Sequence, residues 1–183
     1  MRKLIRQYAK DLTSGRLASG YEHSYRVYKL ARKIGEEIDY DDEILHAACF
    51  LHDIEMAVGH PESSAEKARI ILNETGFAPS KIPQVYDAII NHMPGGTDPD
   101  NTEGKLLYDA NLLESLGAIG FSRLSIGAFF WHHLKTMNEV LDNIKLWLSY
   151  ANSFYFEKST LLSKDKVDFF KMAIRQFEGE LNF

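Results

Sequence analysis

The chain contains 183 residues, of which 45% are hydrophobic and 26% are charged, and its formal net charge at pH 7 is −5. This length suits one domain with a sizeable core, and the composition is ordinary for a soluble globular protein. The negative net charge argues against a nucleic-acid partner, because proteins that track phosphates cluster Lys and Arg, but positive charge can still gather around a small anionic ligand.

Signals for targeting and for disulfides are absent from the sequence. No apolar run reaches the length of a membrane span, so we expect no membrane partner. The first residues, MRKLIRQYAKDLTSGR, carry charges every few positions, unlike a signal peptide. The single cysteine, Cys49, excludes an intramolecular disulfide, and its apolar neighbours predict a buried side chain. These features predict a cytoplasmic protein.

Helical spacing of apolar residues dominates the first half of the chain, and the alternation typical of strands is almost absent. The pattern predicts helices over residues 2–13 and about 20–38. Asp41 or Asp42 is expected to cap a third helix that includes Leu51. A fourth is expected from Pro61, in its first turn, to about residue 75, with Gly76 as its stop.

The second half continues in the same way. A helix is expected over about 80–92, followed by the loop PGGTDPDN and a helix that starts at Asn101 or Thr102. Gly117 and Gly120 are expected to bend or separate this helix from one over about 121–134. Two more are expected near 138–151 and 164–181, the last capped by Ser163. The sequence therefore predicts an all-α, single-domain helical bundle over residues 1–183.

The stretch AACFLHDIEM, residues 47–56, ends an apolar run with His52 and Asp53 side by side. Both groups are costly to bury without a partner. Adjacent residues on a helix diverge by about 100°, so an ion between them needs ligands from other helices. His23 and Asp109 are the candidates; a salt bridge from Asp109 to Lys105 is the alternative.

The order His, His-Asp, Asp resembles the HD-domain superfamily of metal-dependent phosphohydrolases. The blocks that carry the resemblance cover residues 22–123, and they are EHSYRVYKLA, AACFLHDI, HPESSAEKARIIL, VYDAIINHM and EGKLLYDANLLESLGAIGFSR. The last block resembles a branch of small single-domain HD hydrolases. The resemblance implies a helical bundle of the HD-domain type, with its motif core at 22–123 and C-terminal helices 124–183 completing the bundle.

The resemblance also implies a ligand set for a divalent metal, namely His23, His52, Asp53 and Asp109. These donors suit Mn²⁺, Fe²⁺, Co²⁺, Ni²⁺ or Zn²⁺ by ligand type; Mg²⁺ is also admitted, and one ion is expected with two left open. The ion would act as a Lewis acid on phosphorus and lower the pKa of a bound water.

Further site residues follow from the same resemblance. Asp53, His60 and His92 are the expected catalytic residues. For the two histidines we favour proton transfer or phosphate contact over a second metal or a structural role. Helical spacing adds two candidate substrate-binding residues, Arg26, three residues after His23, and Lys105, four residues before Asp109, with salt bridges as the alternative.

Several other polar or aromatic residues stay outside this expected set. Glu55 is more simply a solvated glutamate than a group that positions water. Asn111 stands where many relatives have a second Asp, which puts a contact by that carboxylate in doubt. His46 is expected in the core, and His132 and His133 on a helix surface. Trp131, Trp147 and Tyr155 are more simply core residues than base-stacking ones.

The expected function is a metal-dependent phosphohydrolase that acts on a small phosphorylated substrate, with a nucleotide favoured, by attack of activated water on phosphorus. The sequence does not resolve phosphatase, phosphodiesterase and nucleotide pyrophosphohydrolase activities. Two alternatives are a two-iron HD-type oxygenase, in which His60 and His92 both bind metal, and a non-catalytic nucleotide-binding module. A homodimer is left open.

Overall fold

The computed structural model describes residues 1–56, 60–130 and 133–182. Within these ranges the chain forms helices and no strand, which confirms the predicted all-α class. The elements are, in order, α1 (Arg2–Leu12), α2 (Tyr21–Ile34), η1 (Gly35–Glu37), α3 (Asp42–Leu51), α4 (His60–Glu74), η2 (Pro79–Lys81), α5 (Ile82–Ile90), α6 (Thr102–Glu114), α7 (Gly117–Phe130), α8 (Met137–Ser149), η3 (Tyr150–Asn152) and α9 (Glu157–Leu181).

Side-chain caps fix several of these helix starts, as the sequence predicted. Asp41 accepts the backbone N–H of Glu43 at 2.9 Å and caps α3, while Asn101 accepts that of Gly104 at 2.7 Å and caps α6. The predicted Ser163 cap is wrong. Helix α9 already begins at Glu157, and Ser163 lies inside it, where its hydroxyl donates to a carbonyl of the preceding turn.

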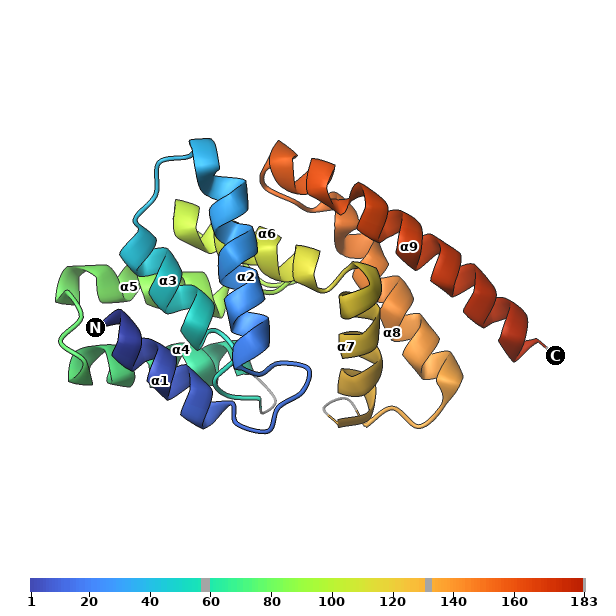
Figure 1. Ribbon diagram of the computed structural model, residues 1–183, viewed down its shortest axis with the longest axis horizontal. Coiled ribbons are helices and arrows are strands. Elements are labelled where there is room, and N and C mark those ends of the chain that lie inside the picture. The colour runs from blue at the N-terminus through green and yellow to red at the C-terminus, as the bar shows by residue number, and fades with distance from the viewer. Residues whose placement is uncertain (57–59, 131–132, 183) are drawn as a thin grey trace.

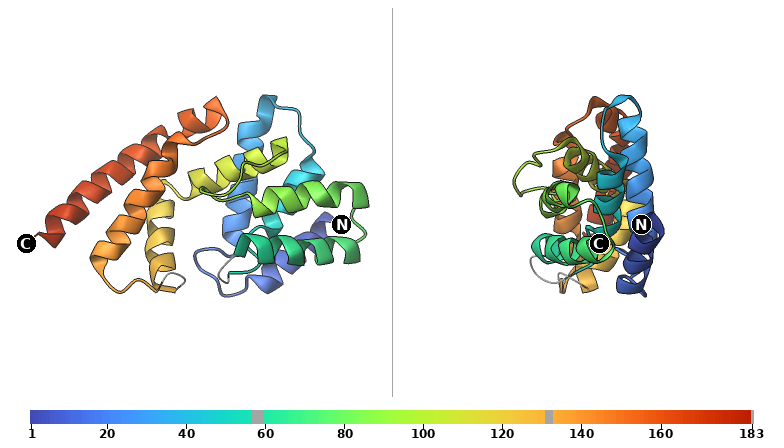
Figure 2. Two further views of the ribbon diagram at one scale, coloured as in Figure 1. Left: turned by 180° about the vertical axis from the view of Figure 1, so that it is seen from behind. Right: turned by 90° about the vertical axis from the view of Figure 1, so that its left-hand side faces the viewer.

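The helices form two groups that lie side by side (Figures 1 and 2). Helices α1–α6 enclose the larger core, which includes Phe50, Leu45 and Leu106. Helices α7–α9 enclose a smaller one around Phe170 and Ile144. Helix α6 contacts helices of both groups, and the long α9 runs from this junction to the C-terminus. The expectation of one domain over residues 1–183 stays a prediction.

Helix α6 lies in the middle of the larger group and is buried on nearly every side. A helix in this position has no solvated face on which to place a charge. It nevertheless carries three buried carboxylates, at Glu103, Asp109 and Glu114. Each must therefore have a partner. Glu103 accepts the backbone N–H of Asp41 at 2.5 Å. Asp109 accepts backbone N–H groups, and Glu114 accepts a hydrogen bond from His23 of α2.

A sharp bend separates α6 from α7. Gly117 has a φ of 76°, which a residue with a side chain rarely adopts, and the two helices meet at 85°. Helix α7 begins at this bend, at Gly117, rather than at about residue 121 as expected. Among the described residues no single helix is long and apolar enough to cross a membrane; α6 and α7 qualify only as a bent pair.

Candidate metal centre

Four helix ends bring five polar side chains to one point in the larger group. His23 lies in the first turn of α2, His52 and Asp53 follow the end of α3, His60 begins α4, and His92 follows α5. The chain reaches His23 by a close turn, in which a Cβ on Gly20 would lie 2.2 Å from the carbonyl oxygen of Arg16. A glycine is required there.

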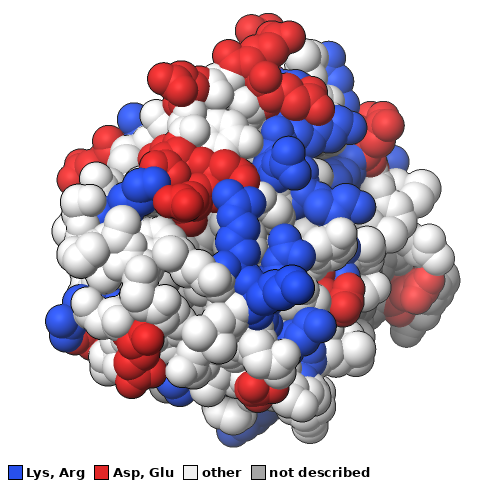
Figure 3. All heavy atoms as spheres, turned by 60° about the vertical axis from the view of Figure 1, so that its left-hand side comes forward, with Lys and Arg blue, Asp and Glu red and all other residues white. Residues whose placement is uncertain are grey.

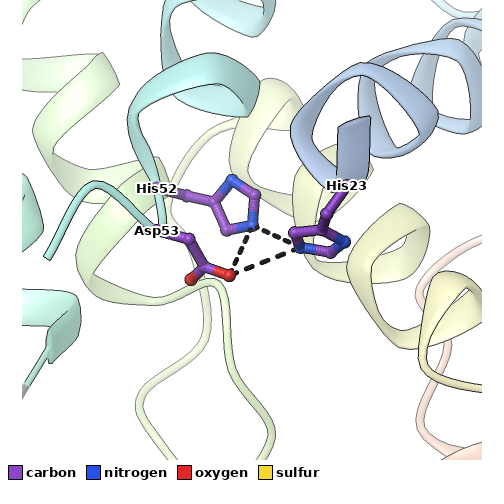
Figure 4. Close-up of side chains that lie close together, drawn as sticks. All are labelled: His23, His52 and Asp53. Atoms are coloured by element: carbon purple, nitrogen blue, oxygen red, sulfur yellow. Dashed lines mark hydrogen bonds and ion pairs between the residues drawn. The ribbon is translucent and has the colours of Figure 1, made fainter. Parts of the chain in front are cut away.

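His23, His52 and Asp53 form the first of two potential metal-binding triads (Figure 4). The two Nε2 atoms lie 3.1 Å apart, and Asp53 Oδ2 lies 3.4 Å from Nε2 of His23 and 3.5 Å from Nε2 of His52. The histidine side chains are fully buried, and that of Asp53 is 8% exposed. Two helix ends, the start of α2 and the end of α3, thus direct three donor atoms toward a common point.

The hydrogen bonds of the histidines fix which ring nitrogen carries the proton. His52 Nδ1 lies 2.9 Å from the carbonyl oxygen of Cys49, and His92 Nδ1 lies 2.6 Å from that of Ile89. His23 Nδ1 lies 3.1 Å from Glu114 Oε2. These oxygens only accept, so each Nδ1 donates and each neutral ring offers its Nε2 lone pair to the cluster. Metal-binding histidines are commonly held in this way.

The charges of the first triad fit a bound cation. Burial lowers the pKa of His52 to about 3, so its ring is neutral at neutral pH. Burial opposes the ionisation of Asp53, but His52 and the other histidines outweigh it and hold the pKa of Asp53 well below its ordinary value. Two lone pairs and a carboxylate oxygen therefore face one another, and a cation removes their mutual repulsion. Donors about 2.1 Å from a divalent ion are about 3.0–3.4 Å apart, close to the spacing found.

His60 and His92 form the second triad with the other oxygen of Asp53. Each Nε2 lies 3.5 Å from Oδ1, and the side chain of His92 is 1% exposed against 19% for His60. The buried His92 Nε2 has no hydrogen-bond partner among the described residues. The structure thus brings all three expected catalytic residues together, while their chemical roles stay predictions.

Asp109, the expected fourth ligand, does not join the cluster. Its Oδ1 accepts the backbone N–H of Tyr155 at 2.9 Å and its Oδ2 that of Phe156 at 3.0 Å. The carboxylate therefore holds the backbone of the two residues that directly precede α9. Burial raises its pKa to about 6, although Ser159 and the two N–H groups act in the opposite direction.

Helix geometry explains where the Asp109 side chain lies. Glu114 follows five residues later, which separates the two side chains by about 140° around α6. Because Glu114 contacts His23, Asp109 must face α9 instead. Asn111 is buried as well, and its position lies about 60° from that of Glu114. The sequence had predicted that Asp109 needs a partner, but that partner is the backbone of residues 155 and 156.

The two expected substrate-binding residues are placed very differently. Arg26 Nε donates to Glu114 Oε1 at 2.5 Å and so lies one contact away from His23. The ammonium of Lys105 lies 5.8 Å from the centre of the Tyr155 ring and makes no described contact with the cluster. The alternative salt bridge from Lys105 to Asp109 is not among the described ion pairs either. Glu55, which was expected to be a solvated glutamate, forms an ion pair with Lys67.

Sequence reasoning missed Glu114 and Arg123. Glu114 binds Arg26, Arg123 and the Nδ1 proton of His23, and these partners outweigh the opposing effect of burial and lower its pKa to about 2. The argument that selected Asp109, a carboxylate among leucines, applies equally to Glu114. Arg123 ends the block LGAIGFSR, where no periodicity marks it as part of a site. Its Nη2 lies 3.2 Å from His23 Nε2.

The remaining expectations concern residues away from the cluster. His46 is buried against Tyr28 and Phe50, as expected of a core residue. Cys49 is free and buried. His133 is exposed but follows α7 with a φ of 51°, so its expected place on a helix surface is wrong. His132 and Trp131 lie outside the described residues.

Comparison with known proteins now identifies the family. A family model described as the HD domain matches residues 20–116, more than half of the chain. The chain belongs to the HD-domain family. Two cyanamide hydratases of Saccharomyces cerevisiae, DDI2 and DDI3, are 31% identical in an alignment of 133 residues that covers 63% of this chain. The match spans 56% of the length of those relatives.

Solved structures share the same fold. A protein from Lactobacillus plantarum superposes with a TM-score of 0.85 over 99% of this chain and 96% of that one, at 18% identity. Bacillus subtilis YpgQ in complex with ADP gives 0.77 over 98% and 94%, at 23% identity. A predicted HD superfamily hydrolase from an uncultured Thermotogales bacterium gives 0.67 over 98% and 92%, at 24% identity. Family and cluster together support a metal-dependent hydrolase.

Proposed function

We propose that the chain is a divalent-metal-dependent phosphohydrolase that acts on a small phosphorylated metabolite, with a nucleotide as the favoured class. The observation that carries the proposal is the pair of triads on the two oxygens of Asp53, with histidine lone pairs directed inward. Hydrolysis forms a P–O bond to the oxygen of water and breaks the P–O bond to the leaving group.

Each residue of the cluster has a role in this scheme. A divalent ion held by His23, His52 and Asp53 supplies Lewis-acid polarisation and a lowered pKa for water. The leaving oxygen needs a proton, and His60 is suited to deliver it because its side chain is partly exposed and can exchange protons with solvent. The buried His92 Nε2 accepts a hydrogen bond from water or substrate and orients it beside Asp53.

An anionic substrate agrees with the distribution of charge. Lys and Arg side chains gather in a band on one face of the molecule (Figure 3), although the net charge is −5. A hollow of about 440 Å³ is lined by Lys10, Arg16 and Arg26 among others. Arg16 also donates to the carbonyl oxygens of Asp53 and Ile54, at 2.9 and 3.1 Å, so this hollow adjoins the cluster. The ADP bound to YpgQ supports a nucleotide.

A second candidate is hydration of a small neutral molecule, because two relatives are named cyanamide hydratases. That reaction adds water across the carbon–nitrogen triple bond of cyanamide and gives urea. It needs an activated water but no proton for a leaving group and no cationic residue for an anion. The two candidates therefore differ in what they require of the arginines near the cluster.

One screen tests both candidates. The metal-free protein is reloaded separately with Mn²⁺, Mg²⁺, Co²⁺, Ni²⁺, Zn²⁺ and, without oxygen, Fe²⁺. It is then assayed with nucleotide mono-, di- and triphosphates, cyclic dinucleotides and cyanamide. We expect release of phosphate or pyrophosphate, its loss in Asp53→Asn, and no change in Asp11→Asn, an exposed control. Equal hydrolysis by Asp53→Asn would contradict the proposal, and urea as the only product would favour the hydratase.

A further inference from the structure

Two guanidinium groups converge on one carboxylate beside the first triad. Arg26 Nε donates to Glu114 Oε1 at 2.5 Å, and Arg123 Nη1 donates to Glu114 Oε2. The same Oε2 accepts the Nδ1 proton of His23. The Glu114 side chain is 3% exposed and that of Arg123 14% exposed, so the pair is largely shielded from water. One carboxylate thus pairs with two arginines and accepts a hydrogen bond from a histidine of the triad.

Arg123 is anchored through two of its nitrogens and directs the third at the triad. Its Nε donates to the carbonyl oxygen of Ala18 at 2.5 Å and its Nη1 to Glu114, while Nη2 lies 3.2 Å from His23 Nε2. Nη2 therefore donates to the lone pair that an ion in the triad takes. When that lone pair is taken, Nη2 stays beside the triad but has lost its acceptor.

A bound divalent ion leaves an excess of positive charge around the triad. Asp53 and Glu114 supply two carboxylates to this region, and Arg26 and Arg123 supply two guanidinium groups. A divalent ion adds two further positive charges in a site with little access to water. Lys166, which lies close enough to interact with Glu114 and Arg26, adds another cation. Uncompensated buried charge is strongly unfavourable.

We propose that Arg123 binds the anionic group of the substrate and that this group is a dianion, such as a phosphate monoester or the terminal phosphate of a nucleotide. Nη2 donates to one oxygen of the anion, while Glu114 and the Ala18 carbonyl hold the guanidinium in place. A dianion offsets the two charges of the bound ion, whereas a neutral molecule such as cyanamide leaves them uncompensated. The inference rests on the proposed function and narrows its substrate class.

Direct binding of inorganic phosphate tests the inference without reference to turnover. Phosphate is titrated calorimetrically into Mn²⁺-loaded wild type, Arg123→Gln and Arg123→Lys, with metal content and thermal stability measured for each. The control is Arg69→Gln, an exposed arginine paired with Glu66 on α4. We expect the affinity of Arg123→Gln for phosphate to be about 10- to 100-fold weaker, and the control to match the wild type.

Each outcome decides for or against the role of Arg123. A folded, metal-loaded Arg123→Gln that binds phosphate as tightly as the wild type overturns it, as does a loaded wild type that binds none. Loss of binding supports it even where no phosphate ester is hydrolysed, a result that contradicts only the proposed function. If Arg123→Gln does not fold, Arg123→Lys decides. A lysine cannot hold Glu114 and reach the anion together, so an unchanged affinity overturns the inference.

Discussion

Replacement of Glu114 by glutamine measures how much of the metal affinity comes from the support of His23. The variant keeps the shape of the side chain but removes the charge that accepts the His23 Nδ1 proton at 3.1 Å. Burial favours the neutral acid, yet His23, Arg123 and Arg26 hold the pKa of Glu114 at about 2 against an ordinary 4.5. This difference corresponds to about 3 kcal/mol in favour of the ionised, folded state.

The sign of this contribution sets the conditions of the assay. Because the folded-state pKa of Glu114 is depressed, its stabilisation is complete above about pH 4.5 and is lost as the pH falls toward 2. At neutral pH we therefore expect Glu114→Gln to unfold more easily by up to about 3 kcal/mol. Its metal affinity should fall about 10- to 100-fold, because His23 loses the group that fixes its tautomer and orientation.

Chelator competition gives the metal affinity, and urea unfolding of the metal-free protein gives the free energy of unfolding. The matched control is Glu103→Gln, which removes another buried carboxylate of α6, one that accepts the backbone N–H of Asp41 and makes no described contact with the cluster. We expect that control to lose some stability but no metal affinity. A folded Glu114→Gln with the wild-type metal affinity would show that His23 needs no support, and the reasoning would fail.

Two further predictions separate the site from its surroundings. Asp109→Asn should keep the full metal content in elemental analysis, while amide exchange at Tyr155 and Phe156 becomes faster, because the Asp109 carboxylate accepts the N–H groups of these two residues. Loss of the metal in this variant would show that Asp109 is a ligand. Burial lowers the pKa of His46 from 6.5 to about 4. Between pH 6.5 and pH 4 the unfolded chain therefore binds a proton at this residue that the folded chain does not bind. The free energy of unfolding should fall by about 3 kcal/mol as the pH drops through this range. His46→Gln keeps an acceptor for Arg6, which donates to Nε2 at 3.1 Å, and it should lose this pH dependence in urea unfolding of the metal-free protein; an unchanged slope would contradict the assignment.

The fold was predictable from sequence because its signals are local. Apolar spacing marked the helices, and short polar residues such as Asp41 and Asn101 marked where two of them begin. The start of α9 was missed for a physical reason. The N-cap residue is Phe156, which makes no side-chain cap, and the backbone just before the helix is held by Asp109, which lies more than forty residues earlier in the sequence.

The candidate site was predictable only as far as its motifs reach. The blocks around His23, His52 and His60 identified residues that the structure does bring together. The buried carboxylates of α6 show where this reasoning ends. Asp109 and Glu114 have equally apolar neighbours in sequence, and only the packing of α2 and α9 on opposite sides of α6 decides which of them meets a histidine.

The two triads differ in how firmly hydrogen bonds hold their histidines, and this difference should set the number of tightly bound ions. In the first, both histidines have their Nδ1 protons fixed by Glu114 and by the Cys49 carbonyl. In the second, His92 is fixed by a carbonyl, but the side chain of His60 is 19% exposed. Donors that are held in place before binding give the tighter site.

We therefore expect a titration with Mn²⁺ to show one tight equivalent per chain. His60→Gln should keep this equivalent and lose turnover, because a glutamine cannot transfer the proton, whereas His23→Gln should lose the equivalent itself. His60→Asn serves as a second variant at the same position and should behave as His60→Gln does. Two equally tight equivalents that weaken together in His60→Gln would contradict this order. They would mean that Asp53 bridges two ions, as the two-iron alternative requires, and that His60 is a ligand rather than a proton donor.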